Sequence, residues 1–266
     1  WIYGSAGYNA SGGTSTEDGD YSKNVDFLKA LTSYGIEYNN KLEEMYKKYS
    51  SPDNAGSNIK AQHINNYCYL REPSIDDGNY YTPSLLEYSK EFSDTAIVVL
   101  GRMAGENMNC SQDKQSKKGS GVSDDYTRHY LEISTEEEKL LAYVGDTYDK
   151  VIVILNIANP FECGFLETIP GLDSCLYVGY TGTRAASIIP SLIYGETSPS
   201  GHTVDTFAYD FYTNPANIFS LPLNYLDYDR NYLDLIENIY VGYRWYETMD
   251  NEGYWDSYGG YHNVVQ

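Results

Sequence analysis

The chain has 266 residues, enough for one large domain or two small ones with a substantial buried core. Its 38 acidic residues outnumber its 18 basic residues, which gives a formal net charge of −20 at pH 7. Such a field repels phosphate backbones and anionic lipid headgroups, so nucleic acid is a poor partner while a neutral ligand such as a sugar is unaffected. The sequence has no apolar run of about 18 residues, so we expect no membrane insertion.

The first third of the sequence alternates strand and helix signals. Trp1–Ser5 predicts a strand that leads into a glycine turn, so we expect the chain to be a trimmed or processed piece that begins inside this strand. Apolar residues then recur at helical spacing up to Gly35, which is typical of a helix end. The elements expected here are a helix over Asn24–Tyr34, a short strand over Ile36–Tyr38, and helices over Lys41–Tyr49 and Ser84–Phe92.

The most informative segment follows these helices. The apolar run Ala96–Leu100 predicts a buried strand that ends in the glycine-rich stretch Gly101–Asn107. That stretch carries a single carboxylate, Glu106. Because ligands bind at the carboxyl ends of strands in open parallel sheets, we expect Glu106 to lie in the functional site.

The second half repeats the alternation more regularly. Ser134 and Glu137 match a capping box, which predicts a helix that continues through Val144. Val151–Leu155 is fully apolar, as a parallel strand covered on both faces requires. The other elements expected are a short helix over Phe161–Glu167, a strand over Cys175–Val178, a helix over Thr183–Tyr194 ended by Gly195, and a strand over Ile239–Tyr246.

Strands that alternate with helices of about ten residues indicate right-handed βαβ units. We therefore predict an α/β fold with a mostly parallel sheet flanked by helices on both faces, an α/β sandwich. No internal repeat or linker is evident, so residues 1–266 are expected to form a single domain.

Two residue types add to this description. The 30 tyrosines exceed the 7 phenylalanines and 3 tryptophans, which fits either a sugar-binding surface or a general tyrosine bias of the source. The 4 cysteines are too few for a disulfide framework. Cys163 and Cys175 are the pair that could form a bridge, but partly buried thiols are the expected state.

Common catalytic and cofactor motifs are absent from the sequence. It has no phosphate-binding loop and no nucleophile elbow, and Gly179–Gly182 lacks the third glycine of a dinucleotide fingerprint. We therefore expect no cofactor and no metal. The histidines show no zinc-type spacing and are expected to be surface or hydrogen-bonded residues: His63, His129, His202 and His262.

Several segments match known sequence elements in order across nearly the whole chain. They are Gly12–Thr14, Ala96–Glu106, Leu131–Leu141, Val151–Asn159, the Pro-Ser-Gly turn in Tyr194–Gly201, and Asn238–Glu247. Together they resemble the α/β sandwich (C-terminal-type) domain of glycoside hydrolase family 3, a family of β-glucosidase-like enzymes. His202–Asp210 is most similar to the branch in which this domain precedes the barrel domain.

The resemblance implies a two-part catalytic unit. In this family a (β/α)8-type barrel carries an aspartate nucleophile, and the sandwich domain contributes the acid/base glutamate from a loop. By motif position Glu106 corresponds to that acid/base residue, and Arg102 and Asn107 are the candidate substrate-binding residues beside it. Arg102 could orient the loop by a hydrogen bond or an ion pair, or it could form a salt bridge with a surface acid.

The chain departs from the family pattern at several points. Asn107 and Asn109 stand where the family has Gly and Asp, and the chain stops at Gln266, where the family continues into a final strand. No barrel is present in these 266 residues, so the isolated chain is expected to be inactive.

Two functions therefore stay open. The first is half of a retaining β-glycosidase that acts on a β-linked oligosaccharide or glycoside with a barrel supplied in cis or in trans. The second is a non-catalytic glycan-binding or interaction module with the same fold. In both cases we expect a secreted or cell-surface protein, although these 266 residues show no signal-peptide pattern.

Overall fold

The computed structural model describes residues 25–49, 72–102, 128–129, 131–182, 184–215 and 237–260. The chain divides into two compact units. The first comprises Trp1–Asn159 with Leu166–Ser200, and the second comprises Pro160–Phe165 with Gly201–Gln266. Each unit is described by itself below, and a single domain over residues 1–266 remains a prediction. The expected first strand, Trp1–Ser5, lies outside the described residues.

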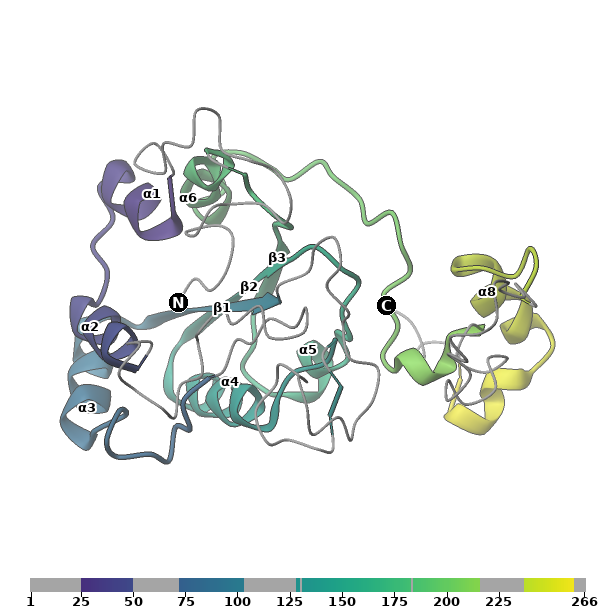
Figure 1. Ribbon diagram of the computed structural model, residues 1–266, viewed down its shortest axis with the longest axis horizontal. Coiled ribbons are helices and arrows are strands. Elements are labelled where there is room, and N and C mark those ends of the chain that lie inside the picture. Colours follow the sequence, from purple (N-terminus) through teal and green to yellow (C-terminus); the bar gives the residue numbers. More distant parts are fainter. Residues whose placement is uncertain are drawn as a thin grey trace, which may run out of the picture. The chain divides into compact units, whose positions relative to one another are not determined.

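The first unit is built on a parallel sheet, shown in Figure 1. Its described strands are β1 (Thr95–Arg102), β2 (Lys150–Ile157) and β3 (Ser174–Tyr177), in the order β1-β2-β3. Thr95 pairs with Lys150 and Arg102 with Ile157, so β1 and β2 run side by side over their full lengths. The strands expected at Ala96–Leu100, Val151–Leu155 and Cys175–Val178 are confirmed.

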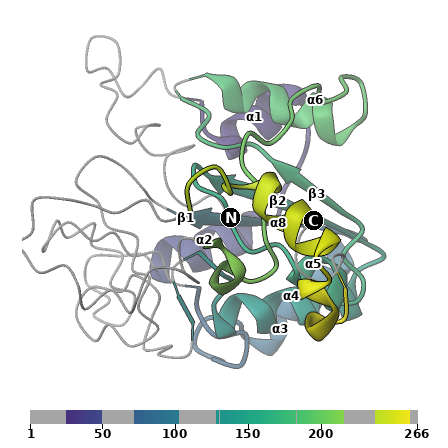
Figure 2. The same cartoon turned by 90° about the vertical axis from the view of Figure 1, so that its right-hand side faces the viewer.

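Helices cover both faces of this sheet. Figures 1 and 2 show α1 (Phe27–Tyr34) and α6 (Ile189–Ile193) on one side, and α3 (Pro83–Phe92) and α4 (Thr135–Thr147) on the other. On the first side the core includes Phe27, Leu31, Val99, Ile154, Ala186 and Ile189. Because side chains alternate along a strand, the buried Val151, Val153 and Leu155 of β2 point to the α4 side. The predicted fold class is confirmed.

The helix ends follow local sequence signals. The Asp26 carboxylate caps α1 by accepting from the Lys29 N–H, and Gly35 ends the helix in the left-handed region at φ 83°. Thr82 caps α3 in the same way, and α2 (Asn40–Tyr49) forms where the sequence predicts it. Among the described helices, none is both long and apolar enough to cross a membrane.

Three further expected elements differ in the structure. Ile36–Tyr38 is not a strand: Ile36 and Tyr38 pack against the core cluster from an irregular segment, so their alternation reflects packing rather than a ladder. The helix over Thr183–Tyr194 is divided into the 3-10 turn Ala185–Ile188 and α6, whose first turn holds Pro190. The expected helix over Phe161–Glu167 shortens to α5 (Phe165–Thr168).

The second unit has a small aromatic core of its own. It contains α8 (Tyr243–Asn251) and two 3-10 turns, Phe211–Thr213 and Tyr254–Tyr258. The buried residues of this core cluster are Ala208, Trp245, Tyr246 and Trp255. The Trp255 Nε1–H donates to the Tyr246 carbonyl at 2.8 Å, and the Trp245 Nε1–H donates to the Thr213 carbonyl at 3.0 Å.

The prediction of a strand over Ile239–Tyr246 is wrong. Gly242 adopts φ 57° and ψ −135°, which interrupts an extended run, and α8 begins directly after it. Trp245 and Tyr246 are both buried in one core. Consecutive residues of a strand point to opposite faces, whereas a helix can turn both toward the same core. Burial of both rings therefore favours the helix over the β-propensity of Ile239–Val241.

Candidate functional site

The candidate site begins at the carboxyl end of β1, where the sequence analysis expects it. Arg102 is the last residue of the strand and is 2 % exposed. Its backbone carbonyl accepts from the Tyr180 hydroxyl at 3.1 Å. On the neighbouring strand, the Asn156 amide donates to the Gly179 carbonyl at 2.7 Å. The loop after β3 is thereby joined by hydrogen bonds to the ends of β1 and β2.

The Arg102 side chain forms a buried ion pair with the first turn of α4. Its Nη1 donates to Glu137 Oε1 at 2.8 Å, and its Nη2 donates to Glu137 Oε2 at 2.6 Å. Nη2 also donates to the Glu132 carbonyl at 2.7 Å, and Nη1 to the carbonyl of Gly101 at 2.8 Å. The planar guanidinium thus meets the carboxylate through two parallel bonds, the strongest geometry for such a pair.

Glu137 is at the same time a member of the predicted capping box, which the structure confirms. The Ser134 N–H donates to Glu137 Oε2 at 2.7 Å, and the Glu137 N–H donates to Ser134 Oγ at 3.2 Å. Burial acts to raise the pKa of Glu137, but the charge and hydrogen bonds of Arg102, together with the Ser134 bonds, hold that pKa below its ordinary value. The carboxylate is therefore ionised and fixed in place near neutral pH.

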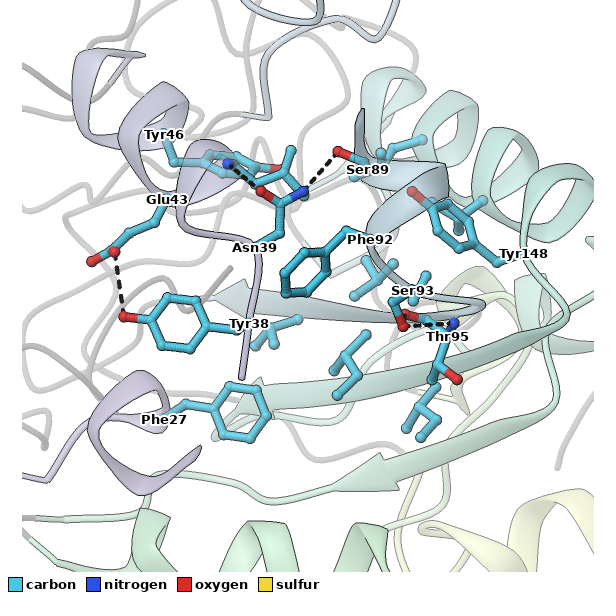
Figure 3. Close-up of a pocket in the computed structure, with 18 of the residues that line it drawn as sticks. Phe27, Tyr38, Asn39, Glu43, Tyr46, Ser89, Phe92, Ser93, Thr95 and Tyr148 are labelled. Carbon is cyan, nitrogen blue, oxygen red and sulfur yellow. Dashed lines mark hydrogen bonds between the residues drawn. The ribbon is translucent and has the colours of Figure 1, made fainter. Parts of the chain in front are cut away.

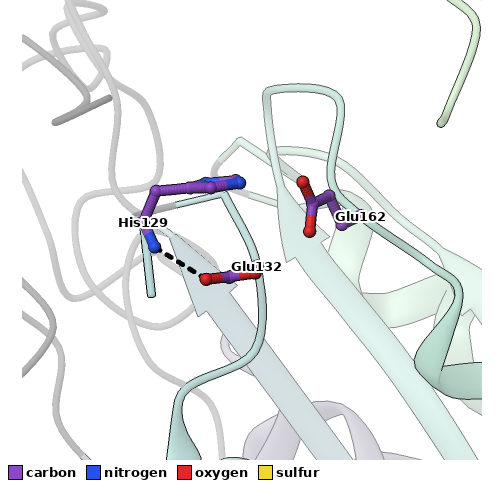
Figure 4. A group of neighbouring side chains, drawn as sticks. All are labelled: His129, Glu132 and Glu162. Atoms are coloured by element: carbon purple, nitrogen blue, oxygen red, sulfur yellow. Dashed lines mark hydrogen bonds between the residues drawn. The ribbon is translucent and has the colours of Figure 1, made fainter. Parts of the chain in front are cut away.

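A second arginine contacts the same turn. Arg128 forms an ion pair with Glu138, and its Nη1 donates to the Ile133 carbonyl at 3.0 Å. The adjoining His129 N–H donates to Glu132 Oε1 at 2.8 Å, as Figure 4 shows. The His129 Nδ1 accepts from the Leu131 N–H at 3.1 Å, so this histidine is hydrogen-bonded as the sequence analysis expects.

Of the predicted site residues Arg102, Glu106 and Asn107, the structure describes only Arg102. Glu106 and Asn107 lie outside the described residues. Arg102 is described, and its partner is the buried Glu137 rather than a surface acid; its role in substrate binding stays a prediction. Sequence reasoning identified Glu137 as a capping residue but missed it as the partner of Arg102, and it did not single out Arg128. The described cysteines, Cys163 and Cys175, are both thiols, as expected.

A separate cavity runs along β1 and has a volume of about 720 Å³. Figure 3 shows that α1, α2 and α3 contribute to its wall, and that the Asn39 amide donates to Ser89 Oγ at 2.8 Å across it. Gly101 and Glu137 line one part of the cavity, whereas Arg102 is not among its lining residues. The mostly apolar wall is typical of a surface that faces a core, and we assign no reacting group to it.

One polar cluster on this wall joins the carboxyl of Glu72 to two tyrosine hydroxyls. The hydroxyls of Tyr46 and Tyr81 both donate to Glu72 Oε1, at 2.8 and 2.6 Å, and lie 2.6 Å from each other. Burial raises the pKa of Glu72 to about 7, even though the two tyrosine hydrogen bonds act to lower it. Glu72 therefore changes charge near neutral pH, unlike the ionised Glu137.

Comparison with known proteins gives a consistent result. Residues 5–246 match the glycosyl hydrolase family 3 C-terminal domain. The chain is 30% identical over 229 residues to a β-glucosidase of Ruminococcus albus, covering 85% of this chain and 21% of that protein. It is 24% identical over 191 residues to β-glucosidase A of Butyrivibrio fibrisolvens, covering 68% of this chain and 21% of that one.

A solved β-glucosidase structure from Paenibacillus barengoltzii shares the fold. It superposes on 90% of this chain and 23% of its own chain, with a TM-score of 0.64 and 23% identity. This chain therefore spans about a fifth of the length of the curated relatives it matches.

Proposed function

The chain belongs to glycoside hydrolase family 3 through its C-terminal-type domain, and from this premise we propose that it is the sandwich half of a retaining, β-glucosidase-like glycosidase. In this proposal Glu106 is the general acid/base residue, and a separate (β/α)8-type barrel, in cis or in trans, carries the nucleophile. The supporting observation is that β1 ends at Arg102 on the carboxyl edge of a parallel sheet, three positions before Gly105 of the Gly-Glu element at Gly105–Glu106.

Retaining hydrolysis uses two carboxyl groups about 5 Å apart. The barrel carboxylate attacks the anomeric carbon while Glu106, in its protonated form, donates its proton to the departing glycosidic oxygen. A glycosyl–enzyme ester results. Glu106, now ionised, then takes a proton from water as that water attacks the anomeric carbon and releases the sugar with its original configuration.

Glu106 must hold a proton near neutral pH to act first as an acid. A second carboxylate nearby or a water-poor site raises the pKa of such a group. The barrel nucleophile supplies that carboxylate once the two parts meet. In this proposal a carboxyl on one domain needs a carboxyl on another, and the proposal predicts that this chain alone is inactive.

The substrate in this proposal is a β-linked oligosaccharide or glycoside. A neutral sugar pays no penalty to approach a chain of net charge −20, whereas a phosphorylated or sulfated one does. Arg102 and Asn107 are proposed to flank the sugar site, with Arg102 acting from its place at the end of β1.

A second candidate function has its own supporting observation. In the second unit, Tyr240, Tyr243 and Tyr254 are all exposed, Tyr243 to 57 %. Tyrosine rings that present an apolar face and a polar tip suit the stacking and hydrogen bonding of sugars. A non-catalytic glycan-binding module would use such residues without any need for Glu106.

One substitution separates the two functions. The proposed role predicts that Glu106→Gln, in the protein that contains this chain and its barrel, lowers kcat/KM for an unactivated β-glucoside by about 10²- to 10⁴-fold. Glu136→Gln is the matched control, because Glu136 is a partly exposed carboxylate of the α4 first turn that contacts Lys139. A binding module instead predicts that the isolated chain binds cello-oligosaccharides in calorimetry, and equally well with Glu106→Gln.

A further inference from the structure

We propose that the second unit carries a binding groove for a neutral sugar, formed by the turn at residues 239–241 and one face of α8. The proposal rests on glycan binding, the second candidate function, and adds the place where the sugar lies; it does not depend on Glu106. The groove has a volume of about 280 Å³. Besides Ile239, it is lined by Tyr240, Tyr243, Arg244, Glu247, Thr248 and Asn251.

The two faces of α8 differ in what they contact. Trp245 and Tyr246 lie in the aromatic core of the second unit, and Met249 packs against it. The groove residues of α8 recur at spacings of three and four positions, which places them together on the opposite face: Tyr243, Arg244, Glu247, Thr248 and Asn251. A polar helix face by itself is typical of a solvated surface. Here the turn that precedes the helix adds a second wall.

That turn supplies apolar surface and is fixed by its backbone. The Tyr240 N–H donates to the Glu237 carbonyl at 2.9 Å. Positive φ angles lie on both sides of the turn, 53° at Asn238 and 57° at Gly242. Ile239 and Tyr240 are nevertheless both exposed. Apolar side chains left exposed beside polar groups mark a binding surface.

Arg244 and Glu247 offer the polar contacts that a sugar requires. In the described part of the chain, neither the Arg244 guanidinium nor the Glu247 carboxylate takes part in a hydrogen bond or an ion pair. The guanidinium lies 5.8 Å from the centroid of the Tyr243 ring, so donor and ring are side by side. A hydroxyl both donates and accepts, so neighbouring hydroxyls of one sugar can accept from Arg244 and donate to Glu247.

The rings and charges of the groove favour a neutral sugar. Tyr240 and Tyr243 present the combination of apolar face and polar tip that suits the C–H groups and hydroxyls of a sugar ring. The groove pairs one cation with one anion in a chain of net charge −20, so an anionic ligand gains little there. Its volume is near the lower end of the range of about 300–1,000 Å³ for small-molecule sites, which suits the end of a short oligosaccharide.

The test is a nuclear magnetic resonance titration of the 266-residue chain with cellotetraose, a neutral β-linked oligosaccharide. We expect weak binding, with a Kd of about 1 mM, and shifts of amide signals concentrated at residues 239–251. Tyr243→Ala removes the stacking ring and Arg244→Ala removes the hydroxyl donor, so each should raise the Kd by about tenfold or more. Tyr243→Phe keeps the ring and should bind nearly as the parent chain does.

Tyr194→Ala is the matched control. Tyr194 is 62% exposed, as open to solvent as Tyr243, but it lies in the first unit and outside the groove. Its removal should leave the Kd unchanged. Near-ultraviolet circular dichroism checks that each variant retains the packing of Trp245 and Trp255, so that a loss of binding is not a loss of fold.

The outcomes separate the groove from the function on which it rests. If the chain binds cellotetraose and Tyr243→Ala and Arg244→Ala bind as well as the parent, the sugar lies elsewhere and the groove is wrong, while glycan binding stands. If the parent chain does not bind cellotetraose, glycan binding fails. Self-association of the chain that Tyr243→Ala abolishes, without sugar binding, would assign this surface to a second copy and overturn the proposal.

Discussion

The guanidinium of Arg102 and the carboxylate of Glu137 are joined by two hydrogen bonds, at 2.8 and 2.6 Å, although the residues are 35 positions apart. The pair connects the end of strand β1 to the capping box that begins α4. The Glu137 side chain thus supports both the start of α4 and the position of the end of β1.

Removing the charge of Glu137 should be costly. Glu137→Gln leaves the Arg102 cation buried without a counter-charge, and such losses typically destabilise a protein by about 3–5 kcal/mol. Urea unfolding of the two proteins at pH 7 measures the difference. Glu136→Gln, one residue away and partly exposed, should change the unfolding midpoint little. Equal effects of the two substitutions would contradict the buried pair.

Lowering the pH should remove the contribution of the ionised Glu137 to the free energy of unfolding. The pKa of Glu137 is below its ordinary value in the folded chain, so the folded state binds this proton less readily than the unfolded state does. Its contribution to stability is therefore present above the unfolded pKa and is lost as the pH falls through the folded pKa. The unfolding free energy of Glu137→Gln should consequently depend less on pH below about 4 than that of the parent chain.

The Glu72 carboxyl should make the unfolding free energy depend on pH in the direction opposite to that of Glu137. Burial raises the pKa of this carboxyl from 4.5 to about 7, so between these values the folded state holds the proton more tightly than the unfolded state. The unfolding free energy should therefore fall as the pH rises from 5 to 8, by at most about 3 kcal/mol. Glu72→Gln should abolish most of this fall, since glutamine keeps an acceptor for Tyr46 and Tyr81.

Denaturant titrations at pH 5 and pH 8 test whether Glu72 causes this fall in the unfolding free energy. The matched control is Glu87→Gln, on the exposed side of α3, which should retain the parent dependence on pH. A Glu72→Gln protein that still loses stability over this range would show that another group is responsible.

A close backbone approach fixes the end of α4. A Cβ at Gly145 would lie 2.2 Å from the Pro170 carbonyl oxygen, and one at Gly171 would lie 2.3 Å from the Gly145 carbonyl oxygen. Gly145→Ala must therefore push α4 away from the Pro170–Gly171 turn, and we expect a loss of about 1–3 kcal/mol. Gly78→Ala is the control, because a Cβ there meets nothing within 4 Å. Thermal melting should separate the two variants.

In the second unit, Trp255 is 1 % exposed and stacks on Tyr246, with ring centroids 5.7 Å apart. Trp255→Phe removes the hydrogen bond to the Tyr246 carbonyl and leaves that acceptor buried, which should cost about 1–3 kcal/mol. Tyr254→Phe changes a ring that is 41% exposed and should have a smaller effect. Near-ultraviolet circular dichroism during unfolding reports on both variants.

Local signals account for the parts of the fold that the sequence predicted correctly. The apolar strands β1 and β2 and the Ser134–Glu137 capping box are each specified by adjacent residues, and each forms as expected. Parallel pairing follows from the alternation of strands and helices. These features determine where the carboxyl edge of the sheet lies, and therefore where the candidate site begins.

The remaining features depend on contacts between distant residues. Nothing near Arg102 in the sequence identifies Glu137 as its partner. The two residues come together only when β1 pairs with β2 and α4 packs on β2. The segment Ile239–Tyr246 has the composition of a strand, yet the burial of adjacent Trp245 and Tyr246 in one core selects a helix. Tertiary burial therefore overrides local propensity at these places.

The central claim is that Glu106 is the acid/base carboxyl of a retaining glycosidase, and azide rescue of Glu106→Ala tests it most directly. Azide needs no general base to attack a glycosyl–enzyme ester. With the proposed barrel present, in cis or in trans, we predict slow turnover of dinitrophenyl β-glucoside by Glu106→Ala, restored by azide with formation of the β-glycosyl azide. Unchanged turnover, or a loss that azide does not restore, would contradict the claim.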